Sequence, residues 1–183
     1  MARTLGQQIN KRTGFASPHE EAMLNIQRTA WLLSGAERAF FRPYGLSPAA
    51  YNLLRILRGH LRNDGDRGDG GAVRASQIGC EMVVRMPDVT RLVDRLETSG
   101  LVARSSCVRD KRVKLVRITP RGMDLLAKID PEVVKLWRSQ LGHMSHEQLT
   151  QISRLLELAR NEQDEGAGHD GHERHDGHEG GTP

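Results

Sequence analysis

The sequence predicts a mainly α-helical fold with a small β-wing, and three observations lead to this prediction. Hydrophobic residues recur at helical spacing in several segments, and two short apolar segments flank a basic stretch over residues 105–112, as in a β-hairpin. Hydrophobic residues make up 37% of the chain and aromatic residues only 4%, which favours an aliphatic helical core over a β-sandwich. A length of 183 residues allows one such core with tails.

The N-terminal part is expected to be an arm followed by a long helix. Residues 1–16 are polar and basic, which predicts a flexible basic arm. A helix then begins at Pro18, because Ser17 suits the N-cap, proline suits the first helical position and Glu20 completes a capping box. We expect this helix over residues 17–42. Its apolar face consists of Met23, Ile26, Ala30, Leu33 and Phe40.

Two more helices are expected before the centre of the chain. Pro43 and Gly45 interrupt the first helix, and Ser47 with Pro48 begins the next one. Residues 62–71 have the composition of a loop, and residues 75–83 can form a short helix. The side chains expected to face inward are Tyr51, Leu54, Leu57, Leu61, Ile78, Met82 and Val83.

The segment over residues 87–100 is the most informative part of the chain. Pro87 suits the first position of a helix and Gly100 suits the left-handed residue that ends one. Short polar side chains and arginines occupy the face opposite the apolar one, as a helix in a groove of DNA would require. The apolar face holds Val89, Leu92, Val93 and Leu96, and the polar face holds Asp88, Thr90, Arg91, Asp94 and Arg95.

A basic hairpin is expected directly after this helix. Residues 101–104 can form one strand and residues 113–118 its partner, with a polar, basic tip between them. A helix, a tight turn and a basic hairpin together make a winged helix-turn-helix lobe, over about residues 46–121. In such a lobe the helix enters the major groove and the hairpin reaches a neighbouring backbone or minor groove.

Two helical segments follow the hairpin. Thr119 and Pro120 begin the first, Pro131 predicts a kink or a restart within it, and Ser145 begins the second with a capping box. The apolar faces over residues 17–42 and about 120–162 exceed what a small winged-helix lobe can bury. A dimerisation domain shared by two copies of the chain would cover them, and a larger intramolecular bundle is the alternative.

The distribution of charge favours a polyanionic partner. The formal net charge is +4, and 26 of the 27 basic residues but only 16 of the 23 acidic ones precede residue 161. A basic body suits double-stranded DNA. Two cysteines, no apolar N-terminal segment and no membrane-length apolar run lead us to expect a cytoplasmic protein without membrane contacts.

With these residues in place, the chain resembles the MarR family of bacterial transcription regulators. The resemblance is carried by residues 87–97, by Gly100-Leu101-Val102, and by Asp110-Lys111-Arg112 leading to residues 118–122. It implies a MarR-like domain over residues 17–162 that forms a homodimer with interleaved terminal helices. It also implies binding to a pseudo-palindromic operator, usually as a repressor released by a small phenolic or aromatic acid.

The resemblance also assigns residues of the DNA-binding surface. Pro87, Asp88, Thr90 and Arg91 match the start of the base-reading helix, and Arg95 is assigned to phosphate. Arg112 matches a wing arginine that enters the minor groove, and Asp110 matches the residue that braces the wing. The tip departs from the family pattern at Cys107 and Val108. The full set of predicted DNA-binding residues is Arg85, Pro87, Asp88, Thr90, Arg91, Arg95, Arg109, Lys111, Arg112 and Lys114.

Ligand sites are predicted with alternatives. Trp31, Tyr51 and Trp137 are candidates for a pocket that takes a small aromatic effector, although ordinary core or interface packing also explains the tryptophans. Cys107 could sense oxidants, and Cys80 is expected to be in the core or half-buried. No cofactor is required for the predicted function.

The tail over residues 163–183 is rich in His, Asp, Glu and Gly. A disordered solubilising tail is the favoured interpretation, and binding of a divalent metal is the alternative. The histidines that would bind the metal recur every third residue, as His169, His172, His175 and His178.

The composition and motifs favour a binding protein over an enzyme. The sequence has no ordered Ser/His/Asp set, no phosphate-binding Gly-Lys-Ser/Thr loop and no His-Glu-x-x-His helix. Two alternatives to a sequence-specific regulator stay open. One is a metal-responsive or metal-handling DNA-binding protein that uses the C-terminal tail, and the other is a non-specific nucleoid-type binder.

Overall fold

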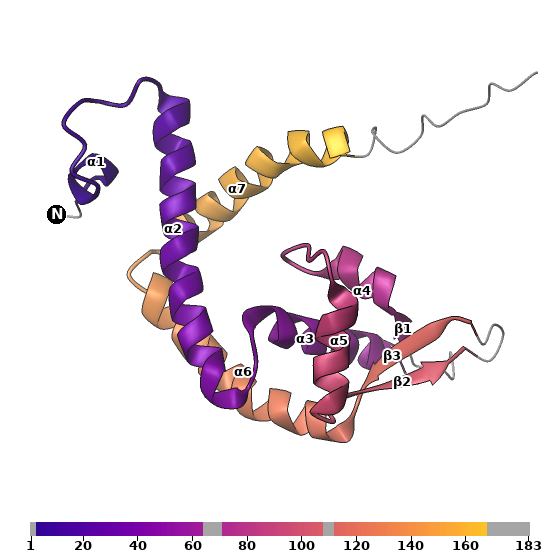
Figure 1. Ribbon diagram of the computed structural model, residues 1–183. Helices are drawn as coiled ribbons and strands as arrows, with labels where there is room; N and C mark the ends of the chain where they lie inside the picture. The colour runs from indigo at the N-terminus through magenta and orange to yellow at the C-terminus, as the bar shows by residue number, and fades with distance from the viewer. Residues whose placement is uncertain (1–2, 64–70, 108–111, 168–183) are drawn as a thin grey trace, which may run out of the picture. The chain divides into compact units, whose positions relative to one another are not determined.

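The computed structural model describes residues 3–63, 71–107 and 112–167, with side chains as far as residue 161. The chain divides into two compact units, Met1–Leu136 and Trp137–Pro183. The fold is mostly helical with a small antiparallel sheet, which confirms the predicted fold class (Figure 1). None of the described helices is long and apolar enough to cross a membrane.

Part of the arm that the sequence predicts to be flexible is instead a short helix, α1 (Leu5–Gln8). Its N-terminus is closed by a capping box in which Thr4 and Gln7 bond each other's backbone. The side chain of Leu5 is buried, and Arg28 of the following helix donates a 2.9 Å hydrogen bond from Nε to the Gln8 side chain. Four residues are too few for a periodic pattern, and the only local signal for this element was the Thr4-x-x-Gln7 capping box, which the sequence analysis did not use.

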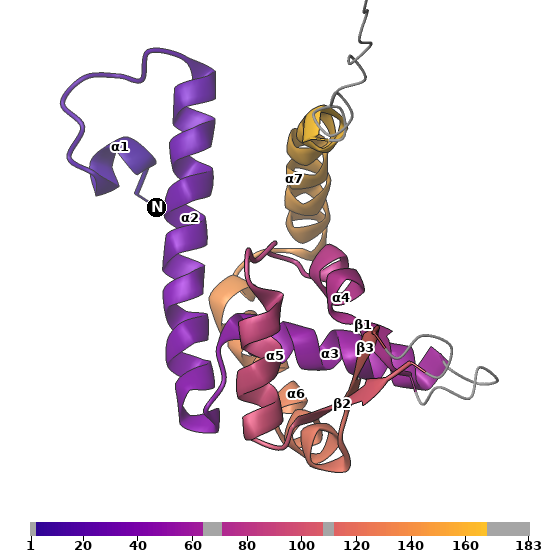
Figure 2. The same ribbon diagram turned by 45° about the vertical axis from the view of Figure 1, so that its right-hand side comes forward.

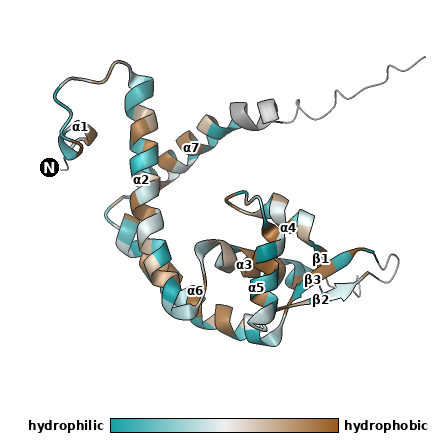
Figure 3. Cartoon of the chain, in the orientation of Figure 1, coloured by the Kyte–Doolittle hydropathy of each residue, from teal (hydrophilic) through white to brown (hydrophobic). Residues whose placement is uncertain are grey.

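The long helix α2 (Pro18–Phe41) begins where the sequence predicts. Ser17 Oγ accepts a hydrogen bond from the Glu20 backbone N–H, but the Glu20 carboxylate accepts from Ala16 N and from Lys11 Nζ instead of closing the capping box on Ser17. Only the end of the helix is buried, at Phe41. Hydrophobic residues nevertheless recur along its whole length (Figure 3).

A short 3₁₀ turn, η1 (Arg42–Tyr44), and Gly45 at φ 68° lead into α3 (Pro48–Asn63). Ser47 Oγ accepts from the Ala50 N–H, as expected of an N-cap. Tyr51, Leu54 and Leu57 are buried as predicted. The prediction for Leu61 is wrong: it is exposed near the end of the helix, and Leu53 fills the core instead.

The helix-turn-helix begins with α4 (Ala75–Glu81), preceded by a two-residue strand, β1 (Val73–Arg74), that the sequence did not predict. Ile78 and Met82 are buried as predicted. Val83 was predicted to face inward, and this is wrong because the side chain is 86% exposed. The helix ends at Glu81, and after the buried Met82 the chain turns away from the core, which leaves Val83 and Val84 exposed.

The second helix of the pair is α5 (Val89–Thr98), and Leu92, Val93 and Leu96 bury its predicted apolar face. Pro87 does not occupy the first helical position, because Asp88 is the N-cap and its side chain accepts from the Arg91 N–H. Proline therefore precedes the cap, and the predicted first helical position was two residues early, since the helix begins at Val89. The Asp88 carboxylate accepts a hydrogen bond from the Arg91 backbone N–H. A proline side chain at the N-cap position could not accept one.

The end of α5 and the wing follow the prediction closely. Gly100 has φ 71°, and the Leu101 N–H donates to Leu96 O at 2.9 Å, which is a Schellman ending. The strands β2 (Val102–Ser106) and β3 (Lys114–Ile118) pair antiparallel in register from Val102↔Ile118 to Ser106↔Lys114. β1 pairs with the other edge of β3, so the strand order is β1-β3-β2.

Two helices follow the wing in the described part of the chain. In α6 (Pro120–Leu141), the helix continues through Pro131. Of the two alternatives predicted there, the restart is therefore wrong, and the kink stays a prediction. Thr119 Oγ1 caps this helix by accepting from the Gly122 N–H while it donates to Gly100 O at the end of α5. In the second unit, α7 (His146–Ala167) begins with both hydrogen bonds of the predicted Ser145 capping box.

Candidate nucleic-acid interface

The candidate interface is built by α4, α5 and the strands β2 and β3. α4 lies at the N-terminal end of α5, and β2 contacts the side of α5 (Figure 2). The exposed face of this part of the chain is rich in cations. The exposed basic residues among those predicted to bind DNA are Arg85, Arg91, Arg95, Arg112 and Lys114.

The N-terminus of α5 carries a pair of functional side chains. Asp88 Oδ1 accepts the Arg91 backbone N–H at 2.9 Å, and Asp88 Oδ2 pairs with Arg91 Nε at 2.8 Å. One carboxylate therefore closes the helix end and also directs the guanidinium. Arg91 remains 83% exposed, so its remaining N–H groups face solvent. Thr90 and Pro87 are also exposed, and their contact with DNA stays a prediction.

A second cluster joins α5 to the wing, and we call it the Arg104 cluster (Asp94, Glu97 and Arg104). The Arg104 guanidinium pairs with Asp94 Oδ1 and with Glu97 Oε2, each at 2.6 Å. The Arg104 backbone N–H also donates to Glu97 Oε1 at 3.1 Å. Burial alone would lower the pKa of Arg104, but the two carboxylates outweigh it and hold the pKa above its usual value.

The sequence did not predict the role of Arg104 and assigned Asp94 only to the polar face of its helix. A signal was present in the strand pattern. Residues two apart in a strand lie on the same face, and Val102 is buried. An arginine two residues further on is therefore directed toward the helix that covers this face, where a charge needs an acidic partner.

The position of the turn before α5 is set by two contacts that the sequence also did not predict. His60 of α3 lies 2.8 Å from the Glu81 carboxylate at the end of α4. Asn52 Oδ1, again from α3, accepts the Val83 N–H at 2.9 Å. Both contacts join the buried helix of the lobe to the turn from which the candidate DNA-reading helix starts.

The wing is described in part. Lys114 at the start of β3 donates a 2.8 Å hydrogen bond to Ser106 Oγ across the hairpin. The predicted residues Arg109, Asp110 and Lys111 lie outside the described residues, as does Val108. Bracing by Asp110 therefore stays a prediction.

The three candidate effector residues have different environments. Tyr51 is buried, and its hydroxyl donates to Asp130 Oδ1 at 2.8 Å. Burial and the Asp130 carboxylate raise the pKa of Tyr51 to about 12. Trp31 is 66% exposed on α2, and Trp137 is exposed in the second unit. An effector pocket that they share stays a prediction.

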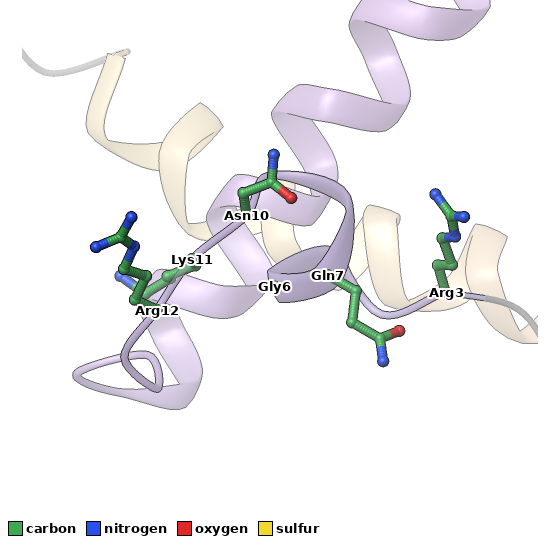
Figure 4. A pocket seen from close by; sticks show the side chains of 6 residues that line it. All are labelled: Arg3, Gly6, Gln7, Asn10, Lys11 and Arg12. Atoms are coloured by element: carbon green, nitrogen blue, oxygen red, sulfur yellow. The ribbon is translucent and has the colours of Figure 1, made fainter.

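A hollow of about 670 Å³ lies elsewhere, around α1. The residues that line it are polar or glycine, and they do not include the predicted effector residues. Figure 4 shows Arg3 and Arg12 at opposite ends, with their guanidinium groups directed away from a common point. Because these cations do not converge on a common point, the lining of the hollow does not form an anion-binding site. Its lining consists of Arg3, Gly6, Gln7, Asn10, Lys11 and Arg12.

The two cysteines and the predicted metal site can be placed as follows. Cys80 is exposed, so the expectation of a core or half-buried position is wrong, and Cys107 is half-buried. Within the described ranges, no group of three or more His, Cys, Asp or Glu side chains could hold a metal ion. The tail histidines, His169, His172, His175 and His178, lie outside those ranges, and the metal prediction stays a prediction.

Comparisons with known proteins agree with this geometry. A family model described as MarR family matches residues 68–114, which include α4, α5 and β2. A MarR transcription factor from Planctomyces limnophilus is 33% identical, over 79% of this chain and 99% of that one, with a TM-score of 0.58. The chain belongs to the MarR family. The resemblance seen in the sequence is confirmed.

Two further structures share the fold of this MarR-family chain at lower identity. Sco3205 from Streptomyces coelicolor, a MarR family transcriptional regulator in complex with DNA, is 21% identical over 82% of this chain and 91% of that one, with a TM-score of 0.66. BpsR from Bordetella bronchiseptica, whose DNA binding is regulated by 6-hydroxynicotinic acid, is 21% identical over 78% of this chain and 100% of that one, with a TM-score of 0.64.

Proposed function

We propose that this protein is a transcriptional regulator that binds double-stranded DNA sequence-specifically as a homodimer, acting as a ligand-released repressor at a pseudo-palindromic operator. The observation that carries the proposal is the exposed face of α5, which is capped by Asp88 and presents Arg91. A bidentate guanidinium matches guanine O6 and N7 in the major groove, worth about 1–3 kcal/mol of discrimination for a good pair.

The wing and the family support the same function. Lys114 and Arg112 are exposed on the hairpin beside α5, where a winged helix contacts phosphates. The related Sco3205 has been captured in complex with DNA. The helices α4 and α5 and the described strands of the wing, β2 and β3, lie in one unit, which supports a single DNA-binding lobe per chain.

A second copy of the chain is the partner that best covers the exposed apolar side chains. Monomeric proteins rarely expose extended apolar surface, and both α2 and α7 do so. In a two-fold dimer the same surface of each copy serves both sides of the interface. The exposed large hydrophobic residues on these helices are Met23, Ile26, Trp31, Leu32, Ile152, Leu155 and Leu158.

Release by a small aromatic acid is the regulatory part of the proposal. It is supported by BpsR, whose DNA binding is regulated by 6-hydroxynicotinic acid. Aromatic acids are therefore the first compounds to screen against the DNA complex.

Selection from a pool of random duplexes tests the DNA-binding proposal. We expect the full-length protein to enrich an inverted repeat and to bind it much more tightly than a scrambled duplex of the same composition. Specific complexes typically exceed non-specific ones by about 10³-fold or more. No enrichment, or equal affinity for the scrambled duplex, would favour a non-specific binder and contradict the proposal.

Light scattering tests the dimer. The wild-type protein is expected at twice the mass of one chain. Ile26→Glu places a charge on the exposed apolar face of α2 and should shift the mass toward one chain. Gln27→Glu adds the same charge at a neighbouring polar position and serves as the matched control. A wild-type monomer over the whole concentration range would contradict the dimer.

A further inference from the structure

The charge balance of α5 poses a problem for a helix that approaches DNA. From its cap to its last turn the helix carries three carboxylates, at Asp88, Asp94 and Glu97, but only two arginines. B-DNA carries one negative charge per about 1.7 Å of its axis, so a net negative helix is repelled. Some other part of the chain has to compensate for this charge.

Pairing within the helix does not compensate for all of it. Asp88 is paired with Arg91, which leaves Asp94 and Glu97 against Arg95. Within the described ranges the Arg95 side chain forms no ion pair with either carboxylate. Asp94 is 55% exposed, so its charge would face an approaching phosphate if nothing covered it.

Arg104 supplies the missing charge from outside the helix. It belongs to β2, yet its two terminal nitrogens bind Asp94 and Glu97 at 2.6 Å each. The second nitrogen also lies 3.5 Å from Thr90 O, and the arginine is only 26% exposed. Because its donors are engaged within the protein, Arg104 is poorly placed to bind phosphate directly.

We propose that Arg104 is a charge-compensating residue for DNA binding, which neutralises Asp94 and Glu97 so that α5 can approach the phosphates. The proposal rests on the proposed function. Arg104 acts through the two carboxylates, so it is a positioning and compensating residue and not a direct DNA contact. Without it, the helix that reads the bases would present two uncovered negative charges to a polyanion.

Four variants of the full-length protein test this inference. Arg104→Met removes the charge and keeps the length of the side chain, and Arg104→Lys keeps the charge without the guanidinium fork. Asp94→Asn with Glu97→Gln removes the carboxylates, and the triple variant combines these with Arg104→Met. Arg117→Met is the matched control. It removes an exposed arginine from β3. Arg117 pairs with Ala103 of β2 and so lies on the same face of the sheet as Ala103, which is the face opposite to that of the next residue, Arg104.

Affinity is measured at low salt for the duplex that the wild-type protein selects and for a scrambled duplex. Arg104→Met should weaken binding to both duplexes by about tenfold or more, because salt-sensitive phosphate attraction dominates both. The triple variant should return to within about threefold of wild-type, and Arg104→Lys should stay within the same range. Arg117→Met should lose clearly less affinity for both duplexes than Arg104→Met does.

The triple variant distinguishes compensation from a purely structural role. The triple variant and Arg104→Met lack the same ion pairs, so thermal unfolding should show similar losses of stability for both. Only charge compensation predicts that the triple variant recovers its affinity for DNA. If the triple variant binds as weakly as Arg104→Met, or if Arg104→Met binds like wild-type, the inference is overturned.

Two further outcomes are decisive. If Arg104→Met does not fold, the Asp94→Asn/Glu97→Gln variant gives the answer in the folded protein: it should bind the scrambled duplex at least as tightly as wild-type, and weaker binding contradicts compensation. If the wild-type protein itself selects no duplex and binds no DNA, the proposed function fails and the inference falls with it.

Discussion

The Tyr51 hydroxyl donates a 2.8 Å hydrogen bond to Asp130 Oδ1 and so joins α3 to α6. Arg58, two turns further along α3, pairs with the other oxygen of the same carboxylate at 2.5 Å. Burial raises the pKa of Asp130, but the hydrogen bonds from Arg58 and Tyr51 outweigh burial and hold it below its usual value. The carboxylate is thus ionised in the folded lobe and stabilises the contact between the two helices.

Replacing Asp130 with Asn should lower the free energy of unfolding by about 2 kcal/mol at neutral pH, since hydrogen bonds to a charged group are lost. Because the pKa is lowered on folding, this contribution is complete above the unfolded value of about 3.9 and is lost as the pH falls through the folded value. Urea unfolding at a series of pH values should show the difference from wild-type shrinking below about pH 4. A difference that stays constant down to low pH contradicts the assignment.

Gly122 lies where the start of α6 meets the end of α5 and the wing. A Cβ at this position would lie 2.4 Å from Leu101 O and 2.8 Å from Ile118 Cγ1. Gly122→Ala should therefore destabilise the protein by about 2 kcal/mol or more, because backbone has to move. Gly59→Ala in α3 is the matched control: apart from the adjacent backbone of its own helix, no atom lies within 4 Å of the added Cβ, so it should stabilise the protein by about 1 kcal/mol. Equal effects in thermal unfolding would be inconsistent with this packing.

The cap of α5 can be separated from its ion pair. Asp88→Ala removes both the hydrogen bond to the Arg91 N–H and the pairing with the Arg91 guanidinium, and should cost about 1 kcal/mol of stability. Asp88→Asn keeps an oxygen that can accept the hydrogen bond from the Arg91 N–H. Chemical denaturation should therefore show less than half the loss of stability found for Asp88→Ala. If both variants are equally destabilised, the cap is not the stabilising contact.

Arg91 and Arg112 should have different effects on DNA binding. Arg91→Ala is expected to reduce the preference for the selected duplex over the scrambled one by about 1–3 kcal/mol, because a base contact is lost. Arg112→Ala is expected to weaken binding to both duplexes alike and to reduce the salt slope, as for a phosphate contact. Gel-shift titrations on both duplexes measure this, and unchanged affinity in both variants would reject the two assignments.

Most of the fold could be predicted because its signals are local. Ser17, Ser47 and Ser145 each accept a hydrogen bond from the backbone N–H three residues on, and Gly100 ends α5 with positive φ. Such capping signals depend on neighbours within a few residues of sequence. The apolar faces of α3 and α5 are local periodic patterns of the same kind.

The sequence predictions were wrong or incomplete where contacts between residues far apart in the chain determine the local structure. Asp130 before Pro131 has the pattern of a new helix start, but the carboxylate binds Tyr51 and Arg58 instead, and the helix continues. β1 is two residues long and exists because it pairs with β3, far along the chain. The sequence near Val83 did not show that Asn52 would bond its backbone and turn the chain outward.

The candidate site divides in the same way. Arg91, Arg95 and the exposed basic residues of the wing follow from the helix pattern and the hairpin. The Arg104 cluster follows only in part. The strand pattern directs Arg104 toward α5, but its pairing with Asp94 and Glu97 depends on the distance between β2 and α5 in the folded lobe.

Protection of guanine N7 from methylation by dimethyl sulfate tests the central claim most directly, because N7 lies in the major groove where α5 is proposed to bind. The account predicts two protected clusters about one helical turn apart on the selected duplex, with protection reduced at a specific guanine for Arg91→Ala. Binding that leaves every guanine N7 equally reactive would show that α5 does not enter the major groove and would contradict the account.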